Sequence, residues 1–423
     1  MLSSAYYFLV LICCATTALA HKSYDGYQVI RTRELRAEDE VENVLSLTEQ
    51  NDYDFLTSPR VGSAVQILVG PEKTDALQSN LRTLGLFPEV LVQNVERALS
   101  LERKTYSSMK RRSRKSVSSD RYLNFDEIMA YIKTVAETFP EIATIIDIGT
   151  SWEGRPMRLL KLSNGPGKNA VFMDSAMHAR EWLGPLTLIH FIDQLTKNLQ
   201  ENQALLDAND WFFLLVANPD GYVYSWSEDR FWRKTRKPNN GSDCIGTDPN
   251  RNFDYLWKEA NDDVCTQHYP GREPFSEPEC AAISKFILEN TKITLYLAMH
   301  SYGQLILLPW EVEKNQTESS DNKLESVAKE AQRALAAVNG TQYSVGTTTQ
   351  VLGYVARGTS FDWAFAKAGI QLSYTMELSP KWNGQVIEAN FILDPARIPV
   401  VKVESWEAVK VFVSHLPETR LNV

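Results

Sequence analysis

Hydrophobic and polar positions alternate in short blocks along most of the chain, and the longest apolar blocks lie after residue 116. Runs of strand length occur at 144–148, 157–162, 170–173, 211–216, 293–299 and 370–376. Helical spacing between and after them predicts helices over 183–199, 279–290, 323–338, 361–367 and 403–413. The run 211–216 has no polar position, which is typical of a strand buried on both faces. The pattern therefore predicts an α/β fold with helices covering both sides of a sheet.

The region before residue 116 has a different pattern, with shorter elements and more charge. Period-two and strand-forming residues predict strands over 27–32, 64–69 and 89–92, and helical spacing predicts helices over 38–48 and 75–84. We expect a small α+β unit there. Its sequence contains no cluster of catalytic side chains.

The first segment, 1–20, is interpreted as a secretory signal. An apolar run from Tyr6 to Ile12 precedes the small residues Ala18-Leu19-Ala20, a typical cleavage site. The alternative is a membrane anchor, but the run is shorter than the roughly 20 apolar residues that a membrane span needs. We expect an exported, extracellular protein that is not bound to a membrane.

A basic run, Lys110-Arg111-Arg112-Ser113-Arg114-Lys115, lies between serine-rich stretches, and we expect it to belong to a flexible linker. Such a run is often only a solvated surface, but in an exported chain it also suits cleavage by a trypsin-like or furin-like protease. We therefore predict a signal peptide over 1–20, a removable domain over 21–115 and a catalytic domain over 116–423.

The charge differs between the two parts. The 423 residues carry a formal net charge of −9, and 43% of them are hydrophobic, as in an ordinary soluble globular protein. Residues 1–115 hold 15 basic and 14 acidic side chains, whereas residues 116–423 hold 29 and 39. The acidic excess disfavours nucleic acid as a partner. We expect a monomer.

Three cysteines remain after the signal segment. Cys244 and Cys265 lie in a loop-rich stretch and are expected to form a disulfide in an oxidising compartment. Cys280 lies at the start of a predicted helix, and we expect it to be a buried free thiol. The glycosylation sequons at Asn240, Asn315 and Asn339 agree with export, although sequons also occur by chance.

Two of the six histidines follow apolar strands directly: His178 and His300. Ligands in α/β proteins bind at the carboxyl ends of strands. Glu181 lies three residues after His178, so one imidazole and one carboxylate could hold the same ion, and His300 would complete a two-nitrogen, one-carboxylate site with an open position. A lone His-x-x-Glu means little, but the three residues together predict a metal site.

The motif His178-Ala179-Arg180-Glu181-Trp182 resembles the first zinc motif of the metallocarboxypeptidases of the carboxypeptidase A/B subfamily. The segment 297–304, around His300, resembles the motif of the third zinc ligand. Further segments agree in type, order and spacing, at 218–221, 230–236, 248–253, 353–363 and 374–378. The resemblance includes 21–115 as the family's activation domain, so it spans nearly the whole chain. It implies a mixed, mostly parallel twisted sheet covered by helices on both faces.

The resemblance also implies roles for the residues of the catalytic centre. His178, Glu181 and His300 would hold one Zn²⁺, which lowers the pKa of a bound water and polarises the scissile carbonyl. Glu377 would be the general base, and Arg233 would stabilise the developing oxyanion.

Further roles concern substrate binding. Arg251 would pair with the C-terminal carboxylate of a peptide, with Asn250 adding amide donors. Tyr354 would close over the substrate from a mobile loop. Three residues would line outer subsites: Arg180, Ser301 and Tyr302.

Two residues bear on which C-terminal side chain is removed. Phe361 occupies the position where basic-specific relatives have an aspartate at the base of the pocket, which favours aromatic and aliphatic side chains. Glu311 replaces a small residue of the pocket wall. Directed inward it would accept a basic side chain, and directed outward it would be an ordinary loop charge, which we favour.

The sequence thus predicts a secreted zymogen of a zinc carboxypeptidase that acts on peptide and protein C-termini. A binding protein that has lost catalysis is the first alternative, but Glu377 and Arg233 are both present. A zinc endopeptidase is the second. It would more often carry His-Glu-x-x-His on a helix, which is absent.

Overall fold

The structure is a computed structural model that describes residues 21–48, 53–57, 59–112, 120–257, 263–309, 319–381 and 391–416. Several predictions fall outside these residues: the signal segment 1–20, the end of the basic run at 113–115, Glu311 and the sequon at Asn315.

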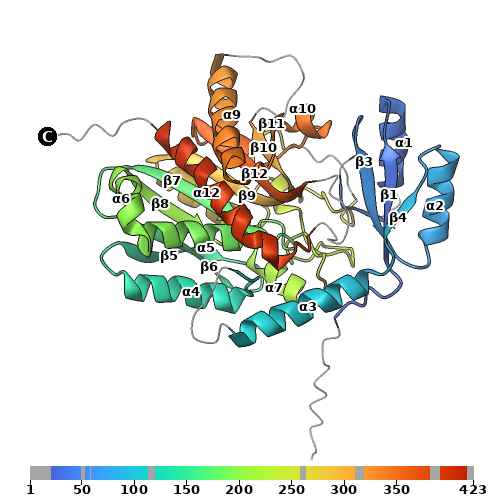
Figure 1. The fold of residues 1–423 in the computed structure, drawn as a ribbon, viewed down its shortest axis with the longest axis horizontal. Helices are drawn as coiled ribbons and strands as arrows, with labels where there is room; N and C mark the ends of the chain where they lie inside the picture. The colour runs from blue at the N-terminus through green and yellow to red at the C-terminus, as the bar shows by residue number, and fades with distance from the viewer. Residues whose placement is uncertain are drawn as a thin grey trace, which may run out of the picture.

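The larger part of the molecule is built on an eight-stranded sheet with the order β11-β10-β12-β9-β7-β8-β6-β5 (Figure 1). Its four central strands, β12, β9, β7 and β8, are parallel, and antiparallel pairs flank them. The strands are β5 (Ala143–Thr150), β6 (Pro156–Leu162), β7 (Asn169–Ser175), β8 (Asn209–Leu214), β9 (Ile293–Gly303), β10 (Leu305–Leu308), β11 (Ser344–Thr347) and β12 (Leu372–Lys381).

Helices cover both faces of this sheet. The first face packs on α4 (Phe125–Thr138), α5 (Leu183–Thr196), α6 (Leu199–Ala208), α7 (Pro219–Ser227), α9 (Ser319–Asn339) and α12 (Ile398–Ser414). The second packs on α8 (Pro278–Glu289), α10 (Thr348–Leu352) and α11 (Ser360–Ala366). Two short 3-10 turns, η1 (Pro249–Arg251) and η2 (Pro395–Arg397), complete this part.

Side chains of the central strands alternate between the two cores, as strand geometry requires. In β7, Val171 and Met173 enter the first core, whereas Ala170 and Phe172 enter the second. Every residue of β8 is buried. The predicted α/β fold with a mixed, mostly parallel sheet is therefore confirmed.

The structure adds elements that hydrophobic spacing did not predict, among them α4, β10 and β11. The start of α4 had a readable signal, because Asn124 and Glu127 form a capping box. The predicted helix 183–199 instead ends as α5 at Thr196, and α6 begins at Leu199.

The N-terminal part forms a separate antiparallel sheet with the order β2-β3-β1-β4. Its strands are β1 (Gln28–Glu34), β2 (Tyr53–Phe55), β3 (Ala64–Val69) and β4 (Glu89–Val92), and its helices are α1 (Glu38–Thr48), α2 (Thr74–Thr83) and α3 (Val95–Arg112). The predicted small α+β unit is thus confirmed, with β2 and α3 as additions.

The two faces of this small sheet have different neighbours (Figure 1). Ile30, Ile67 and Val69 pack against α1 and α2. Val29 and Leu68, on the opposite face, share a core with aromatic residues of the larger part: Phe231, Tyr302 and Phe391. The apolar contact between the two parts explains how the small sheet buries both of its faces.

The beginning of the basic run is not in a flexible linker, which corrects the prediction for residues 110–112. These residues form the last turn of α3. Tyr106, one turn earlier, packs edge-on against Trp226, and Nζ of Lys110 lies 3.1 Å from Oε1 of Glu127. These contacts with α7 and α4 hold α3 against the larger part as far as its last turn, which contains the first basic residues of the run.

No helix within the described residues is both long and apolar enough to cross a membrane.

Candidate metal centre and substrate cleft

The predicted metal ligands come from two neighbouring parallel strands. His178 and Glu181 lie in the loop that joins β7 to α5, and His300 is in β9, which pairs with β7 through Ser175 and Met299. Parallel neighbours end at the same edge of the sheet, so the loop after β7 reaches His300 directly.

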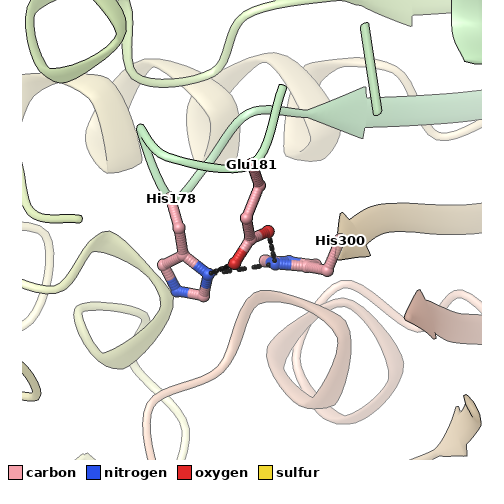
Figure 2. Close-up of side chains that lie close together, drawn as sticks. All are labelled: His178, Glu181 and His300. Carbon is pink, nitrogen blue, oxygen red and sulfur yellow. Dashed lines mark hydrogen bonds and ion pairs between the residues drawn. The ribbon is translucent and has the colours of Figure 1, made fainter. Parts of the chain in front are cut away.

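The three side chains converge on one point, with Glu181 between the two imidazoles (Figure 2). Nδ1 of His178 lies 2.6 Å from Oε1 of Glu181, and Nδ1 of His300 lies 2.9 Å from Oε2 of Glu181. The two Nδ1 atoms are 3.2 Å apart. All three residues are buried, and their donor atoms lie within 4.8 Å of one another. Two imidazoles and one carboxylate fit a zinc centre with an open fourth position.

The electrostatics of the ligands suit a cation. Burial and the charge of Arg233 lower the pKa of His178, which keeps its imidazole neutral and able to bind metal. Burial also lowers the pKa of His300, but Glu181 outweighs it and raises that pKa to about 9. A divalent cation would displace the proton of His300, because a metal ligand must be deprotonated.

Asp248 holds the imidazole of His178 through the ring nitrogen that does not face Glu181. Its Oδ1 is 3.2 Å from Nε2 of His178, while its Oδ2 accepts hydrogen bonds from Nε and Nη2 of Arg233, at 3.2 and 2.9 Å. Burial raises the pKa of Asp248, yet the charge of Arg233 and the hydrogen bond with His178 outweigh burial and hold this pKa well below its usual range. An ionised carboxylate at this place fixes the imidazole ring and its tautomer.

Glu377 faces the metal ligands from the adjacent strand. In the parallel pairing of β12 with β9 it lies opposite His300. Burial, with a further contribution from Glu181, raises the pKa of Glu377 to about 8. A cation held by the neighbouring ligands would favour the carboxylate and lower this pKa. The residue thus combines the position and the basicity that proton transfer requires.

Arg251 and Asn250 lie on the short turn η1, which begins after Asp248. Oδ1 of Asn250 accepts a hydrogen bond from the backbone nitrogen of Ser360 at 2.9 Å. The half-buried Arg251 donates from Nη1 to the carbonyl oxygen of Asn250 at 2.7 Å. Both residues line the same cavity as the metal ligands.

This cavity has a volume of about 820 Å³ and is lined by two of the metal ligands, His178 and Glu181, whereas His300 is not among its lining residues. Beyond the metal ligands, its lining includes the predicted residues Arg180, Arg233, Asn250, Arg251, Ser301, Tyr302, Tyr354, Phe361 and Glu377. Its walls also hold apolar side chains from β10, α10 and the segment after it: Leu307, Leu352 and Ala356. Phe361 is only 1% exposed. The structure therefore brings together residues that are up to 199 positions apart in the sequence, from His178 to Glu377.

The small N-terminal part covers this cavity. Oδ2 of Asp54 lies 2.7 Å from Nη1 of the buried Arg180, and the hydroxyl of Tyr302 donates to the carbonyl oxygen of Leu56 at 2.8 Å. Farther along the seam, Glu102 of α3 receives two hydrogen bonds from Arg230, at 3.0 and 3.1 Å. Two residues that line the cavity, Arg180 and Tyr302, are thus bonded to groups from the N-terminal part.

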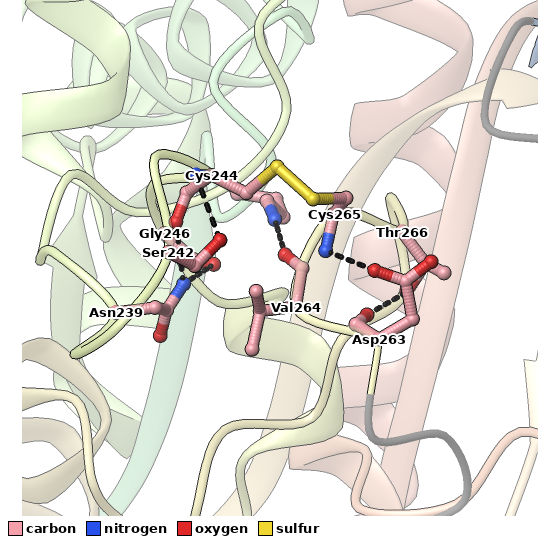
Figure 3. Close-up of a disulfide and its surroundings, with 9 residues drawn as sticks. Asn239, Ser242, Cys244, Gly246, Asp263, Val264, Cys265 and Thr266 are labelled. Atoms are coloured by element: carbon pink, nitrogen blue, oxygen red, sulfur yellow. Dashed lines mark hydrogen bonds between the residues drawn. A yellow bond between two sulfur atoms is a disulfide. The ribbon is translucent and has the colours of Figure 1, made fainter.

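The predicted disulfide is present between Cys244 and Cys265 (Figure 3). Local hydrogen bonds fix both sides of it. Nδ2 of Asn239 donates to the carbonyl oxygen of Cys244, and the backbone nitrogen of Cys265 donates to Oδ1 of Asp263. The segment after the disulfide, Thr266 to His268, lines the cavity. Cys280 is a buried free thiol, as predicted.

Some functional contacts had no role assigned from the sequence. Asp248 is the first residue of the segment 248–253, which resembles the carboxypeptidase family. It precedes a proline and is the N-cap of η1, and this local pattern could have predicted a structural role for its carboxylate. Asp54 and Glu102 had no such signal, because their partners lie 126 and 128 residues away.

Comparisons with known proteins agree with this geometry. Residues 128–408 match the family described as zinc carboxypeptidase, and residues 33–102 match the carboxypeptidase activation peptide. A zinc carboxypeptidase A 1 from Anopheles gambiae is 34% identical over 379 residues, which cover 88% of this chain and 86% of the relative. A carboxypeptidase B from Astacus astacus is 37% identical over 303 residues, covering 70% and 98%.

A solved structure gives the same result for the fold. The crystal structure of the carboxypeptidase A from Helicoverpa armigera superposes with a TM-score of 0.86 at 31% identity, covering 93% of this chain and 98% of that one. The similar proteins include both carboxypeptidases A and carboxypeptidases B, so similarity alone does not choose between the two specificities. Together with the buried His178-Glu181-His300 centre, these matches establish that the chain is a zinc metallocarboxypeptidase with an activation peptide and belongs to the zinc carboxypeptidase family.

Proposed function

We propose that this protein is an exported zymogen of an exopeptidase that removes C-terminal residues from peptides, with a preference for aromatic and aliphatic side chains. The observation that carries the proposal is a single cavity in which a buried metal centre, Glu377 and two arginines, Arg233 and Arg251, face the same space. An exopeptidase needs this combination, because it must hydrolyse a peptide bond and also recognise a free carboxylate.

Glu377 is the general base of the proposed reaction. Zn²⁺ held by the three ligands would supply a Lewis acid that polarises the scissile carbonyl and acidifies a water. Glu377 accepts the proton of the attacking water and then delivers it to the leaving amine nitrogen. Its location opposite His300 keeps it next to the metal centre throughout.

Arg233 has the position for stabilising negative charge on the scissile carbonyl oxygen. Among the described residues its guanidinium donates only to Asp248, through Nε and Nη2, so Nη1 remains for the substrate. The fixed ion pair with Asp248 holds the guanidinium in place before the reaction, which is what makes such stabilisation effective.

Arg251 and Asn250 would bind the C-terminal carboxylate of the substrate. A guanidinium matches a carboxylate in a planar two-hydrogen-bond geometry. Tyr354 follows Gly353, which ends α10 with φ of 79°, and would close over the bound residue. Arg180, Ser301 and Tyr302 would contact residues farther from the C-terminus.

Phe361 supports the apolar preference. It is almost fully buried and lines the cavity together with Leu307 and Leu352. A lysine or arginine side chain in such surroundings would lose its hydration without gaining a counter-charge, at a cost of a few kcal/mol. Glu311 lies outside the described residues, so its effect on this preference is a matter for experiment.

The activation peptide would keep the enzyme inactive by covering the cleft. Cleavage within 110–115 by a trypsin-like or furin-like protease would separate it from the catalytic part, with domain limits of 1–20, 21–115 and 116–423. A signal segment, one disulfide and exposed sequons at Asn240 and Asn339 support export. We expect the active enzyme to be a monomer.

The test compares free and amidated peptides. The protein after trypsin treatment should release C-terminal phenylalanine or leucine, and it should not act on the same peptides with a C-terminal amide. Equal cleavage of the amides would contradict exopeptidase action, because Arg251 would then have no carboxylate to recognise.

Specificity is tested separately with peptides that end in phenylalanine or arginine. We expect phenylalanine to be preferred by at least tenfold in kcat/KM, and Phe361→Asp to reverse the preference because it places a carboxylate at the pocket base. Glu311→Gln is the matched control. A preference for arginine that disappears in Glu311→Gln would instead assign basic specificity to Glu311.

A further inference from the structure

Arg357 is a cation of the cleft that the proposed reaction does not use. It lines the same cavity as Arg251 and Phe361, and it is exposed. In the part of the chain that the structure describes, its side chain has no hydrogen-bond or ion-pair partner. Most exposed arginines are simply solvated, so the location of this one is the feature that matters.

The backbone around Arg357 is fixed close to Arg251. Gly358 has φ of 69°, and a Cβ atom at this position would lie 2.2 Å from the carbonyl oxygen of Arg251. Two hydrogen bonds join the same segments: Phe253 donates from its backbone nitrogen to Gly358, at 3.0 Å, and Gly358 donates to Tyr255, at 3.1 Å. Arg357 therefore projects from a segment that is attached to the substrate-carboxylate site, not from a loose loop.

The other arginines of the cavity differ from Arg357 in their burial or in their partners. Arg233 pairs with Asp248. Arg180 is buried over the ring of Phe391, and it pairs with Asp54 until the activation peptide is removed. Arg251 is reserved for the terminal carboxylate in the proposed function. Arg357 is thus a surplus positive charge at the edge of the cleft, and only a negative group of the substrate would complement it.

We propose that Arg357 is a specificity-determining residue that pairs with a second carboxylate of the substrate, the side chain of an aspartate or glutamate in the last two residues of the peptide. The inference rests on the proposed exopeptidase function and adds a substrate class to it. A guanidinium fork suits a side-chain carboxylate as well as it suits a terminal one. At an exposed site, such a pair is expected to favour the acidic peptide about two- to fivefold.

The test uses the trypsin-activated enzyme and two matched pairs of blocked tripeptides. One pair ends in glutamate or glutamine, and the other ends in phenylalanine preceded by glutamate or glutamine. We expect kcat/KM to favour glutamate over glutamine about two- to fivefold in one of the pairs. The first pair reports a carboxylate in the terminal side-chain pocket, and the second reports one at the penultimate residue.

Arg357→Gln should bring that ratio to about one, and Arg357→Lys should retain part of it, because a point charge remains while the fork is lost. Arg333→Gln is the matched control: Arg333 is an exposed residue of α9 that does not line the cavity, so the ratio should not change. Raising the salt concentration should reduce the wild-type ratio, since exposed ion pairs are screened.

The ratio of kcat/KM between the glutamate and glutamine peptides is measured within each variant. A lower yield of folded enzyme therefore changes both values equally and leaves the ratio unchanged. A wild-type ratio of about one in both peptide pairs would overturn the proposal, as would a ratio that persists in Arg357→Gln. A neutral peptide ending in alanine-phenylalanine serves as the reference. Failure to cleave this peptide would count against the exopeptidase function itself, whereas normal cleavage with no acidic preference would count only against Arg357.

Discussion

The activation peptide and the catalytic part bury polar groups in opposite ways. In the described residues of the activation peptide, the buried polar residues are uncharged: Thr32, Thr57, Gln66 and Thr74. The catalytic part buries charged and titratable groups in its interior, among them His178, Glu181, Arg230, Asp248 and His300. Buried charges cost free energy unless they are paired or bind a metal, so their concentration in one part marks where the chemistry takes place.

Two carboxylates of the activation peptide meet arginines of the catalytic part. Asp54 reaches Arg180, and Glu102 reaches Arg230, while apolar contacts fill the seam between them. A cover of this kind needs no reactive group of its own. It needs a stable small core and a few carboxylates that match arginines of the cleft. The following predictions test this difference, beginning with the largest effect.

Removal of the metal should affect only the catalytic part. Treating the activated enzyme with a zinc chelator should abolish activity, a loss of more than about 10³-fold, because the Lewis acid is lost, and added Zn²⁺ should restore it. In the zymogen, chelation should speed amide hydrogen exchange at residues 176–182, next to the ligands. Exchange in β1 of the activation peptide should not change. Equal changes in hydrogen exchange at residues 176–182 and in β1 would contradict the view that only the catalytic part depends on the metal.

Glu377→Gln should lower kcat by about 10³-fold with little change in KM, because glutamine fills the same space but cannot accept the proton. Steady-state kinetics on the activated enzyme measure this. Glu404→Gln is the matched control, since Glu404 is a buried glutamate of α12 that binds Thr341 and does not line the cleft. A Glu377→Gln variant with more than a tenth of the wild-type kcat would exclude Glu377 as the general base.

Asp54→Asn should loosen the cover without affecting the mature enzyme. A charged hydrogen bond to a buried arginine contributes about 1–2 kcal/mol, so activity of the uncleaved zymogen on small peptides should rise about five- to thirtyfold. Asp39→Asn is the control, because Asp39 is exposed on α1 away from the cavity. If Asp54→Asn and Asp39→Asn gave the same zymogen activity, the activation peptide would be held over the cleft by apolar packing alone.

The smallest expected effect concerns pH. Glu127 accepts hydrogen bonds from Arg121, Tyr106 and the backbone of Asn124, and Lys110 lies beside it. Burial raises its pKa, but these donors outweigh burial and lower the pKa to about 2. Because the folded-state pKa lies below the unfolded value, Glu127 stabilises the zymogen above about pH 4.5, and this stabilisation is lost as the pH falls towards 2.

Denaturant unfolding of the zymogen at pH 6 and pH 3 measures this contribution. Relative to wild type, Glu127→Gln should lose about 1–2 kcal/mol at pH 6, after allowance for solvent screening, and less at pH 3. Glu141→Gln, at an exposed position before β5, should show no such difference. A loss that stays constant with pH would mean that Glu127 acts through packing and not through its charge.

Several features were predictable from the sequence because they depend on local pattern. The nearly continuous apolar runs of β7, β8 and β9 predicted a buried sheet, and the strand-end positions of His178 and His300 predicted ligands at its edge. Cys244 and Cys265 paired as their loop-rich surroundings indicated. The weaker elements β10 and β11 are four residues each, too short for periodicity to identify them.

The sequence by itself determined the two sheets, the identity of the metal ligands and the catalytic family. Strand periodicity and ordered motifs depend on short segments of the chain, so they can be recognised without knowing which segments meet in space. Only the tertiary structure decided which charges meet: Asp54 with Arg180, Asp248 with both His178 and Arg233, and Arg357 at the cleft without a partner among the described residues. The physical reason is that an ion pair depends on distance in space, and the fold sets that distance between residues that can be more than 100 positions apart.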